Sequence, residues 1–232
     1  MPATKINRTA EHPTEGFRSA FLPTTPLRPV RVYLPTDYQP LYAYPLVVFF
    51  HADGESEDHT ARLLPLLSRR NYVAVCLRGP VQLGLRPDGL PAFGWATAAS
   101  AKRDLDAALR HATAEYSVHP DRVFLVGVSE GAALALQLGV AFRQRVAGVV
   151  ALNGSLPKGH IATNNLRVFL GHGTANPKVP FAQARRAAAR LTAAGAAVRV
   201  GRYATSHRVH PDMLRDANRW IMTQVTGKSE EQ

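Results

Sequence analysis

VFLVGVSEGAALALQLG, residues 123–139, is the stretch that decides the fold which the sequence predicts. Apolar residues typical of a strand lead into Gly127-Val128-Ser129-Glu130-Gly131, and an Ala- and Leu-rich helical pattern follows. A serine at such a turn is held on a strained backbone with its hydroxyl exposed at the end of the sheet. The flanking glycines remove Cβ atoms that would collide with the strand and the helix. We therefore predict a strand, a sharp turn and a helix that present Ser129 as a nucleophile.

The composition is that of one globular domain, with 232 residues of which 46% are hydrophobic. We predict this domain at residues 16–227, between a disordered tail at 1–15 and a second tail at 228–232. Cys76 is the single cysteine, which excludes an internal disulfide framework. The N-terminus lacks the apolar core of a secretory signal, and no run approaches the about 18 apolar residues of a membrane span. We therefore expect a cytoplasmic protein without a transmembrane segment.

Strand and helix patterns alternate on both sides of the opening stretch. Further strands are expected at 17–22, 29–34, 45–50, 72–77, 146–152, 166–171 and 197–203, and helices at 56–70, 98–116, 179–194 and 211–225. The first two strands are expected to pair as a hairpin at the sheet edge. The alternation implies right-handed crossovers and a largely parallel sheet of an α/β protein, with helices on both faces.

Residues 78–97 are predicted to form the longest irregular connection, because this segment contains four glycines and three prolines. A loop of this size in a compact domain more often lines or covers a site than merely connects two elements. We expect it to cover part of the substrate pocket. The predicted pocket residues are Leu83, Leu90, Phe93, Trp95 and Leu156.

The order of the motifs resembles the α/β-hydrolase fold, and within it the phospholipase/carboxylesterase family that includes acyl-protein thioesterases. The resemblance covers residues 17–225 and rests on six segments. These are PLVVFFHADG (45–54), LRGP (77–80), GVSEG (127–131), ALNGSLP (151–157), VFLGHGTANPKVP (168–180) and SHRVHPDMLRDANRWI (206–221). The resemblance implies a mostly parallel eight-stranded sheet. We expect no large lid domain, because only residues 153–165 separate the strands between which larger lipases often insert one.

The resemblance also implies the roles of individual residues. In this fold the triad follows the order Ser, acid, His along the chain, so the histidine comes after the last strand. His207 matches the family's catalytic position and is assigned as the general base. His210 precedes Pro211 at a helix start and fits an N-terminal cap instead. The backbone amides of Asp53 and Glu130 are assigned to the oxyanion hole, although Ala52 stands where the family usually has glycine.

The acid position departs from the family, because Asn176 stands where the family carries aspartate. No Asp or Glu lies between Gly131 and Pro211, so the strands that normally supply the acid offer no replacement. An amide can hydrogen-bond the imidazole, but it cannot stabilise an imidazolium and can favour the wrong tautomer. A carboxylate from elsewhere in the chain, such as Asp212 or Asp53, is the alternative.

The net charge of +11 is concentrated in one part of the chain. Residues 131–211 contain eleven Lys and Arg residues and no acidic one, whereas the basic and acidic residues of the remainder balance. Such a region can attract an anionic partner such as nucleic acid or lipid headgroups. The alternative is an arginine-rich solvated surface, which the absence of a nucleic-acid-binding motif favours.

We conclude that the sequence predicts a serine hydrolase of the carboxylesterase and phospholipase type. It would cleave small-molecule carboxylic esters or thioesters through an acyl-enzyme intermediate, at a rate reduced by Asn176. No cluster has the spacing of metal ligands, so neither a metal nor another cofactor is predicted. The alternative from another class is a catalytically silent protein that keeps the fold and binds an anionic partner. The oligomeric state and the substrate's acyl and leaving groups are not predicted.

Overall fold

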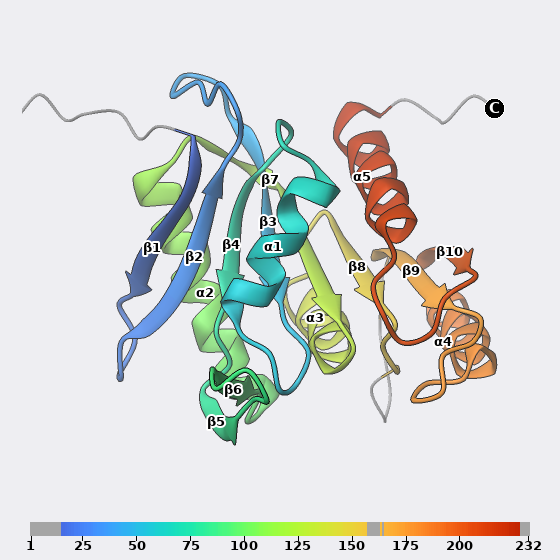
Figure 1. Cartoon of the computed structure of the whole chain (residues 1–232). Helices are drawn as coiled ribbons and strands as arrows, with labels where there is room; N and C mark the ends of the chain where they lie inside the picture. The colour runs from blue at the N-terminus through green and yellow to red at the C-terminus, as the bar shows by residue number, and fades with distance from the viewer. Residues whose placement is uncertain (1–14, 157–162, 164, 228–232) are drawn as a thin grey trace, which may run out of the picture.

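The computed structural model describes residues 15–156, 163 and 165–227. The predicted tail at 228–232 and, apart from Glu15, the predicted tail at 1–15 lie outside the described residues. Eight strands form one sheet in the order β1-β2-β4-β3-β7-β8-β9-β10 (Figure 1). Their bounds are β1 (Gly16–Leu22), β2 (Arg28–Leu34), β3 (Tyr44–Phe50), β4 (Val73–Leu77), β7 (Val118–Val128), β8 (Gly148–Leu152), β9 (Arg167–Gly173) and β10 (Ala197–Tyr203). Strand β2 runs antiparallel to β1 and β4, and the other neighbouring pairs are parallel.

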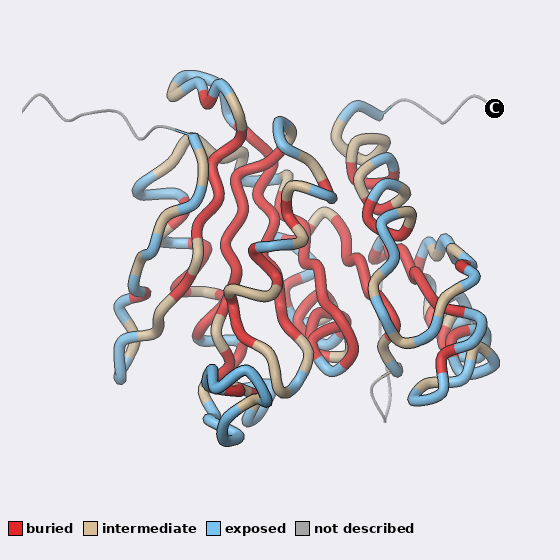
Figure 2. Tube along the Cα trace, in the orientation of Figure 1, coloured by how far each residue is buried: buried red, intermediate tan, exposed pale blue. Residues whose placement is uncertain are grey.

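Helices cover both faces of the sheet, as the sequence predicts. Helices α2 (Ala98–Glu115), α3 (Glu130–Ala141) and α4 (Phe181–Ala193) contribute to the hydrophobic core on one face. Helices α1 (Glu57–Leu67) and α5 (Pro211–Thr226) contribute to the core on the other face. Strand β3 is buried along its whole length, and its alternate residues belong to the two cores, as Val48 and Phe49 illustrate. Figure 2 shows the resulting buried centre, with the central strands red between more exposed helices.

The turn between β7 and α3 fits closely around its two glycines. A Cβ on Gly127 would lie 2.1 Å from the carbonyl oxygen of Gly131. A Cβ on Gly131 would lie 2.4 Å from the carbonyl oxygen of Phe50, at the end of β3. Ser129 has a φ of 54°, a conformation that non-glycine residues rarely adopt. The predicted strand, sharp turn and helix are therefore confirmed, and the turn holds Ser129 on a strained backbone.

The prediction of an irregular connection at 78–97 is wrong. This segment contains a two-stranded antiparallel hairpin of β5 (Val81–Leu85) and β6 (Pro91–Gly94). Its turn closes through Gly89 N–H donating to the Arg86 carbonyl at 2.9 Å, with Gly89 at a φ of 77°. The proline and glycine residues therefore form a turn and its flanks, because an Asp-Gly pair suits this conformation.

The other element boundaries agree with the prediction to within a few residues, apart from the start of β7. This strand begins at Val118, which pairs with Tyr44 across an irregularity in register. The sheet has no large lid domain within the described part of the chain. None of the described helices combines the length and the apolar character that crossing a membrane requires. In Figure 1 the carboxyl ends of the parallel strands point down, toward the β5–β6 hairpin, which is where ligands bind in sheets of this kind.

Candidate active site

Ser129 and His207 face each other at the carboxyl ends of the parallel strands. Ser129 is 5% exposed at the turn, and its amide donates to the carbonyl of Leu152 at 2.9 Å. His207 lies in the loop between β10 and α5, and its Nε2 is 2.9 Å from Ser129 Oγ. Gly173 allows this loop to approach, because a Cβ there would lie 2.2 Å from the carbonyl oxygen of Ser206. The fold thus brings the assigned nucleophile and base into hydrogen-bonding contact.

Asn176 contacts the other nitrogen of the same imidazole. Its Oδ1 lies 3.0 Å from His207 Nδ1, so the amide oxygen accepts the Nδ1 proton. This contact leaves the lone pair of His207 Nε2 free to accept the hydroxyl proton of Ser129. The three residues assigned from the sequence therefore form one continuous chain of hydrogen bonds.

The orientation of the Asn176 side chain is set by two backbone amides. Its Oδ1 also accepts hydrogen bonds from Lys178 N–H at 3.1 Å and Val179 N–H at 3.0 Å. A rotated side chain would point its NH₂ group at these two donors and leave a buried contact unsatisfied, which costs about 1–3 kcal/mol. The backbone therefore keeps the oxygen toward His207, and the amide supports the tautomer that a general base needs.

The NH₂ group of Asn176 has weaker partners than its oxygen. Its Nδ2 lies 3.5 Å from Asn153 Oδ1 and 3.3 Å from His172 Nε2. His172 Nε2 donates to the carbonyl of Val179 at 2.7 Å, so it does not accept a proton from Asn176. Burial lowers the pKa of His172, which keeps this ring neutral. The surroundings of Asn176 therefore satisfy its Oδ1 with hydrogen-bond donors, and they place a further donor, His172 Nε2, near its Nδ2.

Asn153 is a supporting residue to which the sequence analysis assigned no role. It is fully buried with a φ of 54°, at the end of β8. Its Nδ2 donates to the carbonyls of His207 and Arg208 at 3.0 Å each, and its Oδ1 accepts from Gly173 N–H at 2.9 Å. It thus ties the ends of β8 and β9 to the loop that carries His207. An Asn-Gly pair directly after a buried strand is the signal that could have indicated this special backbone position.

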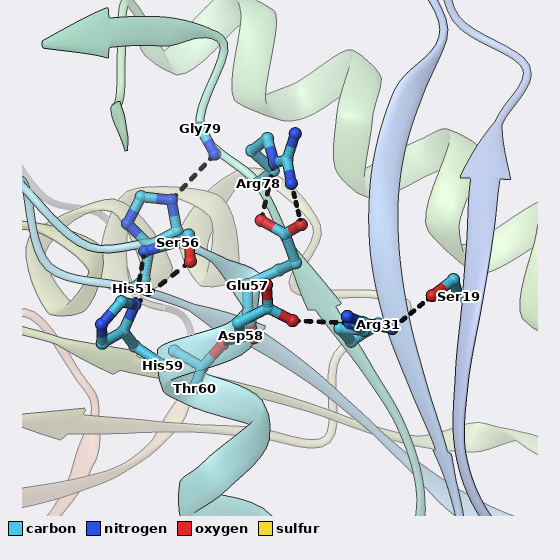
Figure 3. A network of polar contacts seen from close by, with 10 residues as sticks. All are labelled: Ser19, Arg31, His51, Ser56, Glu57, Asp58, His59, Thr60, Arg78 and Gly79. Atoms are coloured by element: carbon cyan, nitrogen blue, oxygen red, sulfur yellow. Dashed lines mark hydrogen bonds and ion pairs between the residues drawn. The ribbon is translucent and has the colours of Figure 1, made fainter. Parts of the chain in front are cut away.

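The strand end that carries Asp53 is held by His51. Its Nε2 accepts from Gly79 N–H at 2.9 Å, as Figure 3 shows, and its Nδ1 donates to the carbonyl of Ala52 at 2.7 Å. Burial lowers the pKa of His51 to about 4, so the ring stays neutral and can accept from Gly79. Trp95 donates its indole N–H to the carbonyl of His51 at 2.9 Å and packs on the ring. The backbone leading into Asp53 is therefore fixed from two sides.

Figure 3 also shows a partly buried ion pair beside this loop. The guanidinium of Arg78 makes two hydrogen bonds to the carboxylate of Glu57, which is 3% exposed. The same guanidinium lies 4.6 Å from the centre of the Phe93 ring. Bidentate pairing fixes Arg78 and thereby the approach of β6 to the start of α1.

Of the two amides assigned to the oxyanion hole, that of Asp53 already has a partner. Asp53 N–H donates to Glu130 Oε2 at 3.1 Å. Burial opposes ionisation of the Glu130 carboxyl, but hydrogen bonds from its own amide, the Ser129 hydroxyl and the Asp53 amide outweigh it and lower the pKa. The side chain of Glu130 therefore occupies the hydrogen-bonding position of the Asp53 amide.

The charge state of His207 follows from its surroundings. Burial lowers the pKa of the imidazole, and the positive charge of Lys178 lowers it further. The carboxylate of Glu130 acts in the opposite direction, and His172 adds a smaller lowering effect. Because the result lies below the ordinary value of 6.5, His207 is unprotonated at neutral pH and can accept a proton.

The two alternative acids have other partners. Asp212 pairs with Arg215, and its second oxygen lies 3.4 Å from His210 Nδ1. His210 accepts from Asp212 N–H at 3.3 Å and caps α5, as the sequence predicts. Asp53 accepts from Trp95 N–H at 3.3 Å. Neither carboxylate contacts His207, whose Nδ1 is occupied by the oxygen of Asn176.

The predicted pocket residues lie in different environments. Leu83 and Leu90 are 53% and 48% exposed on the β5–β6 hairpin, and Leu83 approaches Gly94 beside Asp53. Phe93 and Trp95 are partly buried next to the loop that carries Asp53. Leu156 is partly buried against the core that α2 and α3 share. A role of these five residues in substrate binding stays a prediction.

Comparison with known proteins adds independent evidence. A family model described as phospholipase/carboxylesterase matches residues 41–225. Acyl-protein thioesterase 1 of Saccharomyces cerevisiae is 38% identical over 71 residues, which span 28% of this chain and less than a third (31%) of that protein. The fold is similar to a carboxylesterase of Bacillus cereus, with a TM-score of 0.68 and 19% identity over 85% of this chain and 94% of that one. A carboxylesterase from Mesorhizobium loti gives a TM-score of 0.69 and 17% identity over 88% and 98% of the two chains.

The comparisons and the geometry point in the same direction. The likeness to the two carboxylesterases shows the shared fold at low identity. The family model covers most of the chain, including the sharp turn at Ser129 and the loops that carry Asn176 and His207. The chain therefore belongs to the phospholipase/carboxylesterase family, a hydrolase family of the α/β-hydrolase fold.

Proposed function

We propose that this protein is a serine hydrolase that cleaves carboxylic esters or thioesters through an acyl-enzyme intermediate on Ser129. The observation that carries the proposal is the hydrogen-bond chain of Ser129 Oγ, His207 and Asn176, with contacts of 2.9 and 3.0 Å at a strained turn. A nucleophile within hydrogen-bond reach of a base, itself oriented by a third group, is the arrangement that nucleophilic catalysis needs. The sequence predicts a cytoplasmic location for this activity.

The proposed reaction has two stages. Ser129 Oγ attacks the acyl carbon while its proton passes to His207 Nε2, and the carbonyl oxygen becomes an oxyanion that the amides of Asp53 and Glu130 stabilise. The intermediate collapses as His207 returns the proton to the departing alcohol or thiol, which leaves Ser129 acylated. Water then attacks the acyl-enzyme with the same base and releases the carboxylic acid.

Asn176 supports the proposed base without supplying charge. In serine proteases, replacement of the triad aspartate by asparagine lowers turnover about 10⁴-fold, or roughly 5 kcal/mol, and the wrong tautomer of the histidine is a cause. Here the amides of Lys178 and Val179 fix the amide oxygen toward His207. The tautomer is therefore correct, and the remaining deficit is the missing negative charge beside the imidazolium.

The rival proposal is a catalytically silent protein that binds an anionic partner through its basic region, 131–211. In this region, exposed arginines lie along α4 and the edge strand β10, whereas Lys158 lies outside the described residues. The exposed arginines of these two elements are Arg185, Arg186, Arg190, Arg199 and Arg202. Binding alone has no need for the contact between Ser129 and His207, which favours the enzyme.

Labelling with a fluorophosphonate tests the proposal directly. We expect covalent labelling of the wild-type protein, loss of labelling in Ser129→Ala, and strongly reduced labelling in His207→Ala. Ser19→Ala, at an exposed position on the distant strand β1, serves as the control and should be labelled like the wild type. Undiminished labelling of Ser129→Ala would exclude Ser129 as the nucleophile.

Binding to anionic vesicles and to DNA at low salt tests the rival. Contacts with an anionic surface should be measurable at low ionic strength and fall steeply as salt increases. Reversal of charge at Arg185 and Arg186 to glutamate should remove such binding. Absence of binding to either partner at low salt would leave the arginines as a solvated surface.

A further inference from the structure

The carboxylate of Glu130 lies against one of the two amides assigned to the oxyanion hole. Asp53 N–H donates to Glu130 Oε2 at 3.1 Å, so the side chain of Glu130 takes the hydrogen bond of one of the two amides assigned to the oxyanion hole. The two amides are the donors that the proposed reaction needs for the tetrahedral intermediate. An oxyanion and a carboxylate oxygen carry the same sign of charge, so both cannot occupy this point.

We propose that Glu130 closes the oxyanion hole of the free protein with its own carboxylate, and that a substrate must displace this carboxylate before Ser129 can be acylated. This inference rests on the proposed serine-hydrolase function. Glu130 then has two opposed parts in the reaction: its backbone amide stabilises the oxyanion, whereas its side chain hinders access to that amide.

The surroundings of the carboxylate support displacement by substrate over opening by protonation. Asp53 and Glu55, in the loop between β3 and α1, bring like charges near it; burial raises the pKa of both carboxyls, and the charge of Glu130 adds to this effect. The positive charge of Lys178, in the loop between β9 and α4, acts on Glu130, Glu130 acts on His207, and Arg86 of the hairpin acts on Glu55. Because hydrogen bonds outweigh burial and keep Glu130 ionised, the carboxylate stays charged near neutral pH. The exposed ammonium of Lys178 offers a counter-charge to the displaced side chain.

A different role for Glu130 makes the opposite prediction. Burial and Lys178 lower the pKa of His207, and the negative charge of Glu130 opposes them; in this role Glu130 would supply part of the charge that Asn176 lacks. In that case removal of the carboxylate would lower turnover. If the carboxylate closes the hole, its removal raises the rate of acylation.

The test compares Glu130→Ala, Glu130→Gln and Glu130→Asp by the second-order rate of fluorophosphonate labelling and by kcat/KM for a p-nitrophenyl ester. We expect increases of about tenfold or more in Glu130→Ala and a smaller increase in Glu130→Gln, because the competent fraction of the protein rises. Glu130→Asp keeps the charge on a side chain one methylene shorter. Its labelling rate and kcat/KM should lie between those of Glu130→Gln and the wild type. Glu115→Gln, an exposed position at the end of α2, controls for the loss of one negative charge.

A second readout does not require turnover. Phenylboronic acid forms a tetrahedral anion on a reactive serine, and one of its oxygens needs the oxyanion hole. We expect Glu130→Ala to bind it about tenfold more tightly than the wild type, measured by competition with labelling and by the rise in Tm. A Tm of the free variant close to that of the wild type shows that the fold is intact.

The outcomes separate this inference from the proposed function. Labelling of the wild type that depends on Ser129, together with Glu130 variants that are no faster and bind boronate no more tightly, would overturn the inference alone. Lower kcat in both Glu130→Ala and Glu130→Gln, with retention in Glu130→Asp, would assign the carboxylate to charge stabilisation of His207 and also overturn it. Absence of labelling in the wild type and in every Glu130 variant would overturn both proposals.

Discussion

The two halves of the site differ in where they place negative charge. The half formed by Ser129, His207 and Asn176 has a neutral amide where a carboxylate would stabilise the imidazolium. The half formed by the amides of Asp53 and Glu130 contains a carboxylate where the reaction needs an empty, electropositive site. The hydrogen bonds in both halves have ordinary lengths, so the two halves differ in charge and not in hydrogen-bond geometry. A site with suitable hydrogen-bond geometry can therefore still have a low turnover number. Isosteric substitutions that change only the charge measure how much the charge limits turnover.

The largest effect is expected from Asn176→Asp, which adds charge to the first half. The new carboxylate would keep the donors of Lys178 and Val179, and its second oxygen would face His172 Nε2, now 3.3 Å from the Asn176 nitrogen. We expect kcat to increase about 10- to 10³-fold, less than the about 10⁴ seen in serine proteases, because the tautomer is already correct. KM should change less, because the interaction strengthens in the transition state.

Steady-state kinetics with one p-nitrophenyl ester is the measurement for Asn176→Asp. The control is Asn165→Asp, which adds a carboxylate at an exposed asparagine away from His207. An equal or lower kcat in Asn176→Asp, with no loss of Tm, would mean that charge at this position does not limit the reaction. The contrast between the two halves would then rest on Glu130 alone.

The pH dependence of kcat/KM should distinguish the two halves by the direction of its shift. Burial, with a further contribution from Lys178, lowers the pKa of His207, so activity should rise with pH through a midpoint below 6.5 and then level off. Asn176→Asp should move this midpoint to higher pH, because a carboxylate favours the imidazolium. Glu130→Gln should move it to lower pH, because it removes a charge that raises the pKa of His207. Shifts of the same sign in both variants would contradict the assigned charges.

The fold was predictable from the sequence to a greater extent than the charge of the site. Gly127 and Gly131 flank the turn at Ser129, where neighbouring backbone atoms leave no space for a Cβ. The two glycines in the sequence therefore indicate a sharp turn. The pairing of Ser129 with His207 follows from the order of strands in that fold, once it is recognised. Local sequence patterns therefore sufficed to predict the structure at positions where a residue type has a single structural explanation.

Other features depend on contacts that no local pattern encodes. Glu130 reaches Asp53, 77 positions away, through a side-chain conformation that sequence does not indicate. The orientation of the Asn176 amide depends on two backbone amides whose direction is known only when the loop is folded. The hairpin at 81–94 was missed because its glycines and prolines suggested an irregular loop, although Asp88-Gly89 is a favourable turn pair. The sequence shows which groups are present, and the fold decides which of them meet.

The smallest effect is expected at Trp95, which lies next to the second half of the site. Its ring packs on Phe50 and His51, its amide donates to Asp53 at 3.3 Å, and its indole N–H donates to the carbonyl of His51. We expect Trp95→Ala to change the preference among p-nitrophenyl esters of different chain length a few-fold, on the scale of about 1 kcal/mol for partial loss of an apolar wall. This change should exceed its effect on thermal stability.

Trp95→Phe separates the contribution of the ring from that of its hydrogen bond. The smaller ring keeps an aromatic surface against His51 but removes the donor to its carbonyl, a net loss of about 0.5–1.5 kcal/mol in stability. If Trp95 forms part of the acyl pocket, Trp95→Phe keeps the chain-length profile of the wild type while its Tm falls slightly. If Trp95 only supports the loop before Asp53, both variants lower kcat for every ester by the same factor, and the profile stays unchanged. That result would place the pocket elsewhere and make the hydrogen bonds to His51 the sole contribution of Trp95 to the oxyanion side.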